Sequence, residues 1–362
     1  MKPFIPDKLP LKNLDWTRFI KSLSLANRVL ARYDGILQSL PNPGVLLSQL
    51  TTQEAVLSSK IEGTQATLAD VLKFEVKPHS KERSGDIREV LNYRKALRLA
   101  EEELKNRPLS LNLLKRMQKT LLSDVRGKEV LLGRFRTFQN FIGKPGSKIE
   151  EARFVPPAPD MLKEALDNFE KYIHYEENDR LVQLAIIHAQ FEIIHPFGDG
   201  NGRIGRILIP LFLYEKKILN SPMFYISAYF ENNRDEYYHH LKEITDKGNW
   251  QDWILFFLKA LIKQGENSTR KAQEILKTYD TMKLEFPKII RSQYSLQAID
   301  FLFSFPIFDS KIFRQSSGIP KASANRIIGK LQQNKVITQL ESASGRSAAF
   351  YIFDKLFNIV ES

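Results

Sequence analysis

The sequence predicts a mainly α-helical protein whose C-terminal end forms a small winged helix-turn-helix domain. Two observations support this prediction. Apolar residues recur at helical spacing through most of the chain between residues 44 and 280. The tail then changes character: it gives a turn, a helix over about 320–333, and two β-like runs, VITQL and AAFYIF, around SASGR. That is the element order of a winged helix-turn-helix.

The helical part of the chain is divided by proline and glycine. PNPG at 41–44 interrupts the backbone, and a helix over 44–60 is expected to follow. Gly63 comes directly after Glu62, where a helix end would place a glycine. Ser110 is the expected N-cap of its helix. The remaining predicted helices cover about 65–74, 86–107, 110–122, 159–177, 180–194, 203–217, 234–246 and 249–280, and a linker is expected near 281–292.

The segment 133–158 is not helical in character. GRFRTFQNFIGKPGSKIEEARFVPPAP holds three glycines and ends its β-like run at Pro156-Pro157. We expect a hairpin or an exposed loop between helices.

The composition limits the classes of chemistry. The chain has 362 residues, no cysteine and a net charge of +12. Disulfides, thiolate metal sites and cysteine nucleophiles are therefore excluded. The length favours two or three domains. Because neither a secretory signal nor an apolar run of about 20 residues is present, we expect a cytoplasmic protein without a membrane partner. The basic excess favours nucleotides, nucleic acid or an acidic protein face, although an ordinary basic surface explains it equally well.

One short stretch concentrates reactive side chains: HPFGDGNG at 195–202, followed by Arg203 and Arg206. An apolar helix ends before it and another begins after it, so the glycines form a loop that leads into a helix N-terminus. The free N–H groups and the dipole there attract anions, and glycine lets a phosphate approach the amides closely. Asp199 supplies an oxygen ligand that suits Mg²⁺. The two arginines, three residues apart on one helical face, would neutralise further phosphate charge.

His195 opens the loop and is a suitable base for a hydroxyl group near neutral pH. Phe197 is expected to point into the core. Other interpretations remain open. The glycines at 200, 202 and 205 match the dinucleotide fingerprint in spacing, but that motif follows a strand. A metal site from His188, Glu192 and His195 is conceivable, as is a purely structural loop.

HPFGDGNGRIGR resembles the Fic motif, H-x-F-x-[D/E]-G-N-G-R-x-x-R, at every defined position. The resemblance, over roughly residues 1–265, implies a Fic helical core with a β-hairpin flap. It also implies a protein adenylyltransferase, which transfers AMP from ATP to Tyr, Ser or Thr hydroxyls of target proteins and of itself. By this resemblance His195 is the general base, assisted by Arg203 and Arg206, and Asp199 is the Mg²⁺ ligand. The residues expected to contact ATP are Glu62, Gly200, Asn201, Gly202, Arg203, Ile204, Gly205, Arg206 and Tyr237.

Further features follow from the resemblance. Relatives that act as kinases carry lysine at the position of Gly202, so its glycine favours nucleotidyl transfer. SSKIEGTQ at 58–65 is similar to the family's inhibitory pattern, with Ser58, Glu62 and Gly63. It implies that Glu62 pairs with Arg206 and displaces the γ-phosphate. A plain helix end with a solvated glutamate is the alternative.

YFENNRDEYYHHL resembles the segment beside the adenine, with Tyr237 as the expected contact and Tyr238 as its competitor. The segment around 133–158 resembles the flap, which holds a target by strand-like pairing.

The expected domains are an N-terminal helical region with the inhibitory motif, the catalytic core, a helical linker and the winged domain, at 1–85, 86–265, 266–290 and 291–362. Lys321, Arg326 and Lys330 lie on or near the candidate recognition helix, where they could meet DNA phosphates. A DNA-binding regulator with a nucleotide-sensing site is therefore an alternative function. Removal of AMP at the same site, use of another nucleotide such as UTP, and a homodimer also stay open.

Overall fold

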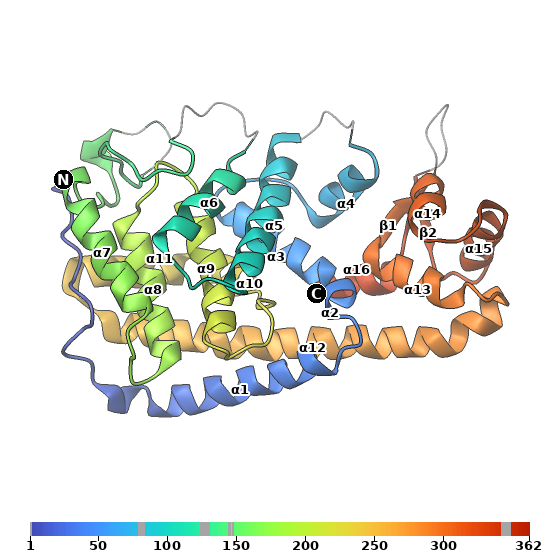
Figure 1. Ribbon diagram of the computed structural model, residues 1–362, viewed down its shortest axis with the longest axis horizontal. Helices are drawn as coiled ribbons and strands as arrows, with labels where there is room; N and C mark the ends of the chain where they lie inside the picture. Colours follow the sequence, from blue (N-terminus) through green and yellow to red (C-terminus); the bar gives the residue numbers. More distant parts are fainter. Residues whose placement is uncertain (1, 79–83, 124–130, 144–145, 147, 342–348) are drawn as a thin grey trace.

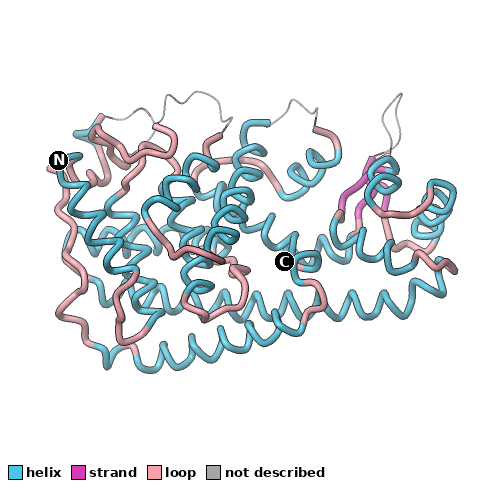
Figure 2. Tube along the Cα trace, viewed as in Figure 1, coloured by secondary structure: helices cyan, strands magenta, loops and turns pink. Residues whose placement is uncertain are grey.

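The computed structural model describes residues 2–78, 84–123, 131–143, 146, 148–341 and 349–362. Its N-terminal two thirds are helical, and the three strands all lie in the C-terminal part (Figures 1 and 2). The first elements are η1 (Trp16–Arg18), α1 (Ile20–Ser39), α2 (Pro43–Leu46), α3 (Ser48–Ile61), α4 (Leu68–Val76), α5 (Ser84–Leu104), α6 (Leu111–Leu121), η2 (Ile149–Glu151) and η3 (Pro159–Met161).

The next group contains the most buried helices of the protein. These are α7 (Leu162–Ile173), α8 (Arg180–Ile194), α9 (Asn201–Glu215), α10 (Ser227–Asn232), α11 (Arg234–Lys247) and α12 (Trp250–Ile290). Apart from Arg180 and Glu192, every residue of α8 is buried, as are nearly all of α9. Helices that are apolar on all sides belong inside a bundle, so α8 and α9 form its centre.

The long helix α12 connects the two ends of the molecule. It has 41 residues, which corresponds to about 60 Å. α1 packs along its first half and runs parallel to it, and the C-terminal elements lie over its second half (Figure 1). The helix predicted to end near residue 280 therefore continues to Ile290, through most of the segment 281–292 where a linker was expected. The reason is that Tyr279, Met282, Phe286 and Ile290 continue the buried face at helical spacing.

The C-terminal part consists of α13 (Ser295–Ser304), β1 (Ile307–Asp309), α14 (Ser310–Ser316), α15 (Lys321–Gln333), β2 (Thr338–Glu341), β3 (Phe350–Ile352) and α16 (Asp354–Glu361). The antiparallel sheet has the order β1-β3-β2, with Ile307 and Thr338 both opposite Ile352. The helix and the two β runs predicted for the tail are confirmed, while SASGR lies outside the described residues. The winged helix-turn-helix assignment, and with it the domain boundaries, stay predictions.

The segment expected to form a hairpin flap contains only one antiparallel bridge, Ile142 to Phe154, within its described residues. Its tip, at 144–145 and 147, lies outside them. Pro156 and Pro157 lack the N–H groups that a longer ladder needs, and Val155 instead accepts a bond from the N–H of Phe4 at 2.9 Å. The described flap is thus an extended loop rather than a pair of strands.

Candidate functional site

The loop 195–202 joins the two central helices, α8 and α9. His195 ends α8 in the left-handed conformation, with φ 48°. Gly200 begins α9 with φ 84°, and a Cβ atom there would lie only 3.1 Å from Leu121. A glycine is therefore required at this turn. The turn directs the first amides of α9 toward the loop, where an anion can reach them.

Asn201 holds the loop in shape. Its side chain accepts a hydrogen bond from the N–H of Phe197 and donates one to the Phe197 carbonyl, both at 2.8 Å. The Phe197 ring is fully buried and lies 5.2 Å from the ring of Phe135. The predicted core position of Phe197 is confirmed. The Asn201 side chain thus fixes the conformation of the loop, and its backbone N–H can bind a ligand.

His195 is held as a neutral imidazole. Nδ1 lies 3.3 Å from the carbonyl oxygen of Glu192, so the proton is assigned to Nδ1 and the lone pair to Nε2. Burial lowers the pKa of His195 to about 4. At neutral pH the ring can therefore accept a proton from a hydroxyl group.

Arg136, from the start of the flap segment, fixes the backbone around His195. Its guanidinium donates to the carbonyls of His195, Phe138 and Pro157 at 3.0, 3.1 and 2.6 Å. The arginine is 2% exposed. It connects the flap to the loop, and sequence reasoning missed it because a single arginine among aromatic residues carries no distinctive signal.

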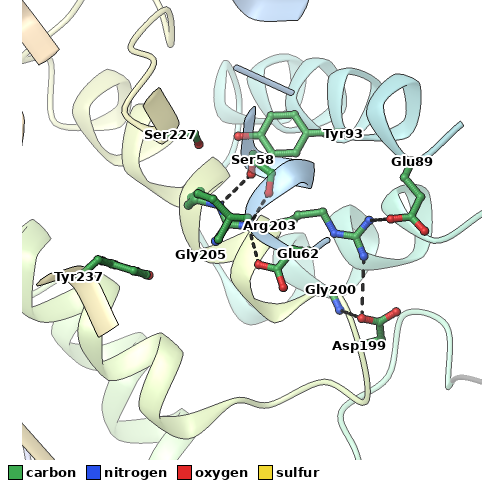
Figure 3. A network of polar contacts seen from close by, with 12 residues as sticks. Ser58, Glu62, Glu89, Tyr93, Asp199, Gly200, Arg203, Gly205, Ser227 and Tyr237 are labelled. Carbon is green, nitrogen blue, oxygen red and sulfur yellow. Dashed lines mark hydrogen bonds and ion pairs between the residues drawn. The ribbon is translucent and has the colours of Figure 1, made fainter. Parts of the chain in front are cut away.

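Arg206 binds the end of α3 rather than solvent. Its Nε donates to Ser58 Oγ at 2.8 Å, and its Nη2 donates to the Ser58 carbonyl at 2.9 Å and to Glu62 Oε1 at 2.6 Å (Figure 3). The arginine is 1% exposed and the Glu62 side chain 36%. The Nε and Nη2 donors of the guanidinium are thus occupied by Ser58 and Glu62, two residues one helical turn apart at the end of α3.

The charges of this pair support each other. Burial raises the pKa of Glu62, but the charge and hydrogen bond of Arg206 outweigh burial and leave that pKa below its usual value. Burial lowers the pKa of Arg206, and Glu62 reverses this so that the pKa lies above its usual value. Both groups are charged at neutral pH, and the contact is an ion pair.

The Glu62 carboxylate also covers the first turn of α9. A Cβ atom on Gly202 would overlap Glu62 Oε1 and lie 3.0 Å from Arg206 Nη1. Gly63 follows with φ 104°, which allows the chain to turn away after α3. Ser58 and Glu62 are therefore brought to the start of α9, and Gly63 forms the turn that follows them.

Helix α3 is anchored from the opposite side by α10 and α11. The buried Glu54 accepts hydrogen bonds from the N–H and the hydroxyl of Ser227 at 3.0 and 2.6 Å. Arg234 donates to the carbonyl of Ile61 at 2.6 Å, one residue before Glu62. Burial raises the pKa of Glu54 to about 7. These contacts fix the orientation from which Glu62 reaches α9.

Arg203 has a separate partner, Glu89 of α5, at 2.5 Å, and its Nη2 lies 3.8 Å from Asp199 Oδ1 (Figure 3). Asp199 Oδ1 also accepts a bond from the N–H of Gly200 at 2.6 Å. No group of three His, Cys, Asp or Glu side chains that could hold a metal occurs in the described parts of the chain. Mg²⁺ commonly binds one protein carboxylate and completes its shell with phosphates and water, so a single accessible Asp199 fits such an ion. Glu89 was not predicted.

A cavity of about 530 Å³ lies beside the loop. Its walls come from the end of α3, the end of α8, the flap and one face of α11. They are formed by Ile61, Glu62, Ile142, Gly143, Arg153, Phe154, Glu192, Ile193, Arg234, Asp235, Tyr238, Leu241, Lys242 and Thr245. The guanidinium carbons of Arg153 and Arg234 lie 6.0 and 5.9 Å from the Tyr238 ring centroid. The cavity is large enough for a nucleotide and carries three basic residues.

The expectation for Tyr237 is wrong. Tyr237 is 1% exposed and bonds through its hydroxyl to His188 Nε2 at 3.0 Å, within an aromatic cluster below the cavity. Its neighbour Tyr238 lines the cavity instead. His188 also contacts the carbonyl of Gly205, which makes it a structural core residue. The Ile204 side chain is fully buried too, so only its backbone faces the loop.

Comparison with known proteins identifies the family. The model of the Fic/DOC family N-terminal region matches residues 20–102, and the Fic/DOC family model matches residues 108–213. The chain belongs to the Fic/DOC family. It is 35% identical over 96 residues to a probable protein adenylyltransferase of Aquifex aeolicus, a match that covers 26% of this chain and 28% of the relative. It is 30% identical over 127 residues to the protein adenylyltransferase Fic of Drosophila grimshawi, which covers 34% and 23% of the two chains.

The matches thus span about a quarter of these two relatives. Among solved structures, a Fic family protein from Desulfovibrio desulfuricans G20 is similar over 98% of each chain, with a TM-score of 0.61 and 17% identity. That likeness supports the mainly helical fold. None of the described helices combines the length and the apolar character needed to cross a membrane.

Proposed function

We propose that the protein transfers AMP from ATP to a side-chain hydroxyl of a target protein and of itself, with Mg²⁺ bound, and that Glu62 inhibits this reaction. The main support is the neutral His195 at the end of α8, directly before the glycine-lined first turn of α9. The names of the two sequence relatives, both adenylyltransferases, support the same reaction.

The proposed reaction uses the loop as an anion cradle. The α-phosphate lies against the amides of residues 200–203, where the helix dipole stabilises its charge. The target hydroxyl attacks the α-phosphorus while His195 Nε2 accepts its proton. A bond forms between the hydroxyl oxygen and the phosphorus, the bond to the β-phosphate oxygen breaks, and pyrophosphate leaves. A bound Mg²⁺ on Asp199 would neutralise charge on the phosphates.

Inhibition follows from the Arg206 contacts. Because Glu62 and Ser58 occupy the guanidinium, Arg206 is not available to the γ-phosphate, which is then held in another orientation. The Glu62 carboxylate also covers the backbone at Gly202, where the phosphates would lie. Removal of Glu62 is expected to free both the arginine and this part of the backbone.

The position of the label in ATP tests the reaction. The Glu62→Gly protein is incubated with Mg²⁺ and ATP labelled at the α- or the γ-phosphate. Covalent α-label that depends on His195, with no γ-label, supports AMP transfer. Protein that takes up γ-label instead would be a kinase, and protein that takes up neither label would contradict the proposal.

DNA is a second candidate partner of the C-terminal part. Lys321 and Arg326 are exposed on α15, and residues 291–362 hold nine basic and five acidic side chains. Lys330 does not contribute as expected, because its Nζ donates to the carbonyl of Ile290 at 2.7 Å and so caps α12. Salt-dependent binding of the full chain to duplex DNA is the test.

A further inference from the structure

Glu192, in the last turn of α8, is a carboxyl group without an assigned role. It lines the cavity beside the loop, and its Oε1 is shielded from solvent. Within the described part of the chain, this oxygen has no hydrogen-bond partner. An unpaired polar atom in such a position is unfavourable, so a ligand that supplies a donor would offset that cost.

The position of the carboxyl group depends on Gly205. A Cβ atom at this residue of α9 would overlap Glu192 Oε1, and it would also lie 3.2 Å from Phe191 Cδ1. The absence of a side chain on α9 therefore makes the space in which the Glu192 carboxyl group lies. Burial raises the pKa of Glu192 to about 7.

The other carboxylates around the cavity are less suited to a buried ligand. Glu62 is already paired with Arg206, and Asp235 is exposed at the start of α11. The basic lining residues, Arg153, Arg234 and Lys242, donate hydrogen bonds and cannot accept them. Glu192 is thus the acceptor with a shielded, unpaired oxygen that remains on this wall.

Helix geometry indicates which part of a nucleotide would meet it. Glu192 precedes His195 by three residues, which is about 4.5 Å along α8. In a nucleotide the sugar follows the α-phosphate, and the base lies further away. With the α-phosphate beside His195, the sugar falls near Glu192, and the base extends along α11 toward Leu241 and Thr245. The 2′- and 3′-hydroxyls of ribose are adjacent donors that one carboxyl group can bind together.

We propose that the Glu192 carboxyl group binds the ribose 2′- and 3′-hydroxyls and makes the site selective for ribonucleotides over deoxyribonucleotides. This inference rests on the proposed function, since it uses the α-phosphate position beside His195. It predicts a binding preference that can be measured without any transfer reaction.

The test measures reversible binding by calorimetry to the Glu62→Gly, His195→Ala protein, which cannot use His195 as a base. The ligands are ATP, 2′,3′-dideoxy-ATP and the triphosphate of purine riboside, which lacks the 6-amino group. We expect ATP to bind about 10- to 100-fold more tightly than the dideoxy analogue. Adding Glu192→Ala should reduce this ratio to about 3-fold or less, and Glu192→Gln, which keeps the volume, should leave an intermediate ratio. Asp235→Asn, the matched removal of a carboxylate from the same cavity, should leave the ratio unchanged.

Three results would overturn the inference. The first is no preference for ATP over the dideoxy analogue in the parent protein. The second is a preference that persists in a folded Glu192→Ala protein. The third is loss of discrimination against the purine riboside analogue instead, which would mean that Glu192 contacts the base. The proposed function is tested separately, by the absence or presence of covalent α-label. A protein that binds none of the three nucleotides would refute both the proposed function and the role of Glu192.

Discussion

Replacing Glu62 by glycine should increase the affinity for ATP more than the affinity for AMP. The substitution removes the 2.6 Å ion pair to Arg206 and the carboxylate over Gly202, while both Ser58 contacts to Arg206 persist. A hydrogen bond between charged groups contributes about 1.5–3 kcal/mol. Since the Glu62 side chain is 36% exposed, solvent screening reduces this to about 1–2 kcal/mol.

That energy corresponds to a gain of roughly 5- to 30-fold in ATP affinity. The assay is calorimetric titration with ATP and with AMP, in a His195→Ala background that prevents turnover. AMP lacks the β- and γ-phosphates, so it should not benefit from a free Arg206. Glu231→Gln is the matched control, because Glu231 forms the neighbouring ion pair with Lys60 at 3.4 Å and does not touch α9. Equal changes for ATP and AMP, or no change for either, would refute the reasoning about the γ-phosphate.

Three further outcomes are expected. The labelling rate of the Glu62→Gly protein should stay level from pH 8 to about 5 and fall only toward pH 4, because burial depresses the pKa of His195. The same low pKa means that the unfolded chain takes up this proton first, so the free energy of unfolding should decrease as the pH drops from 6.5 toward 4. Acid-denaturation curves can check this. Arg136→Ala should lower the labelling rate about 10²-fold by releasing the loop, with Arg136→Lys failing to restore it, whereas wild-type rates would contradict this. Lys321→Ala should weaken any binding to duplex DNA and make that binding less dependent on salt. Lys330→Ala should lower only the melting temperature of the protein, because Lys330 caps α12. The opposite pattern would exclude α15 as the DNA contact.

Much of the site could be predicted because its chemistry is local in sequence. His195, Asp199 and Arg206 lie within twelve consecutive residues, so their chemistry could be interpreted together. Glu62 contacts Arg206 as the resemblance implied, and Ser58, one helical turn earlier, contacts the same arginine. Where a motif is contiguous, helix geometry alone brings its side chains to one surface.

The partners that hold these residues were not predictable. Glu89 binds Arg203 although the two lie 114 residues apart in the sequence, and Arg136 binds the carbonyl of His195 although these two lie 59 residues apart. A single charged residue so far from its partner looks the same in sequence whether it is solvated or buried.

The Tyr237 error has a related cause. Adjacent residues on α11 point about 100° apart, and only the His188 contact shows which tyrosine faces the core.

Helix boundaries failed where the pattern was weak rather than absent. Helix α1 was not predicted at all: its buried residues Ala26, Val29, Tyr33 and Leu37 follow helical spacing, but polar residues and Asp34-Gly35 obscure the pattern. For the flap the residues left a hairpin or an exposed loop open, and its described part is a loop, because β-like residues do not guarantee a ladder once prolines remove its donors.

Intact-protein mass spectrometry of the Glu62→Gly chain after incubation with ATP and Mg²⁺ tests the central claim most directly. Self-modification should add the mass of one or more AMP groups, and the same treatment of the Glu62→Gly, His195→Ala chain should add none. An unchanged mass in the first protein, or an AMP adduct that persists without His195, would contradict the role assigned to this loop.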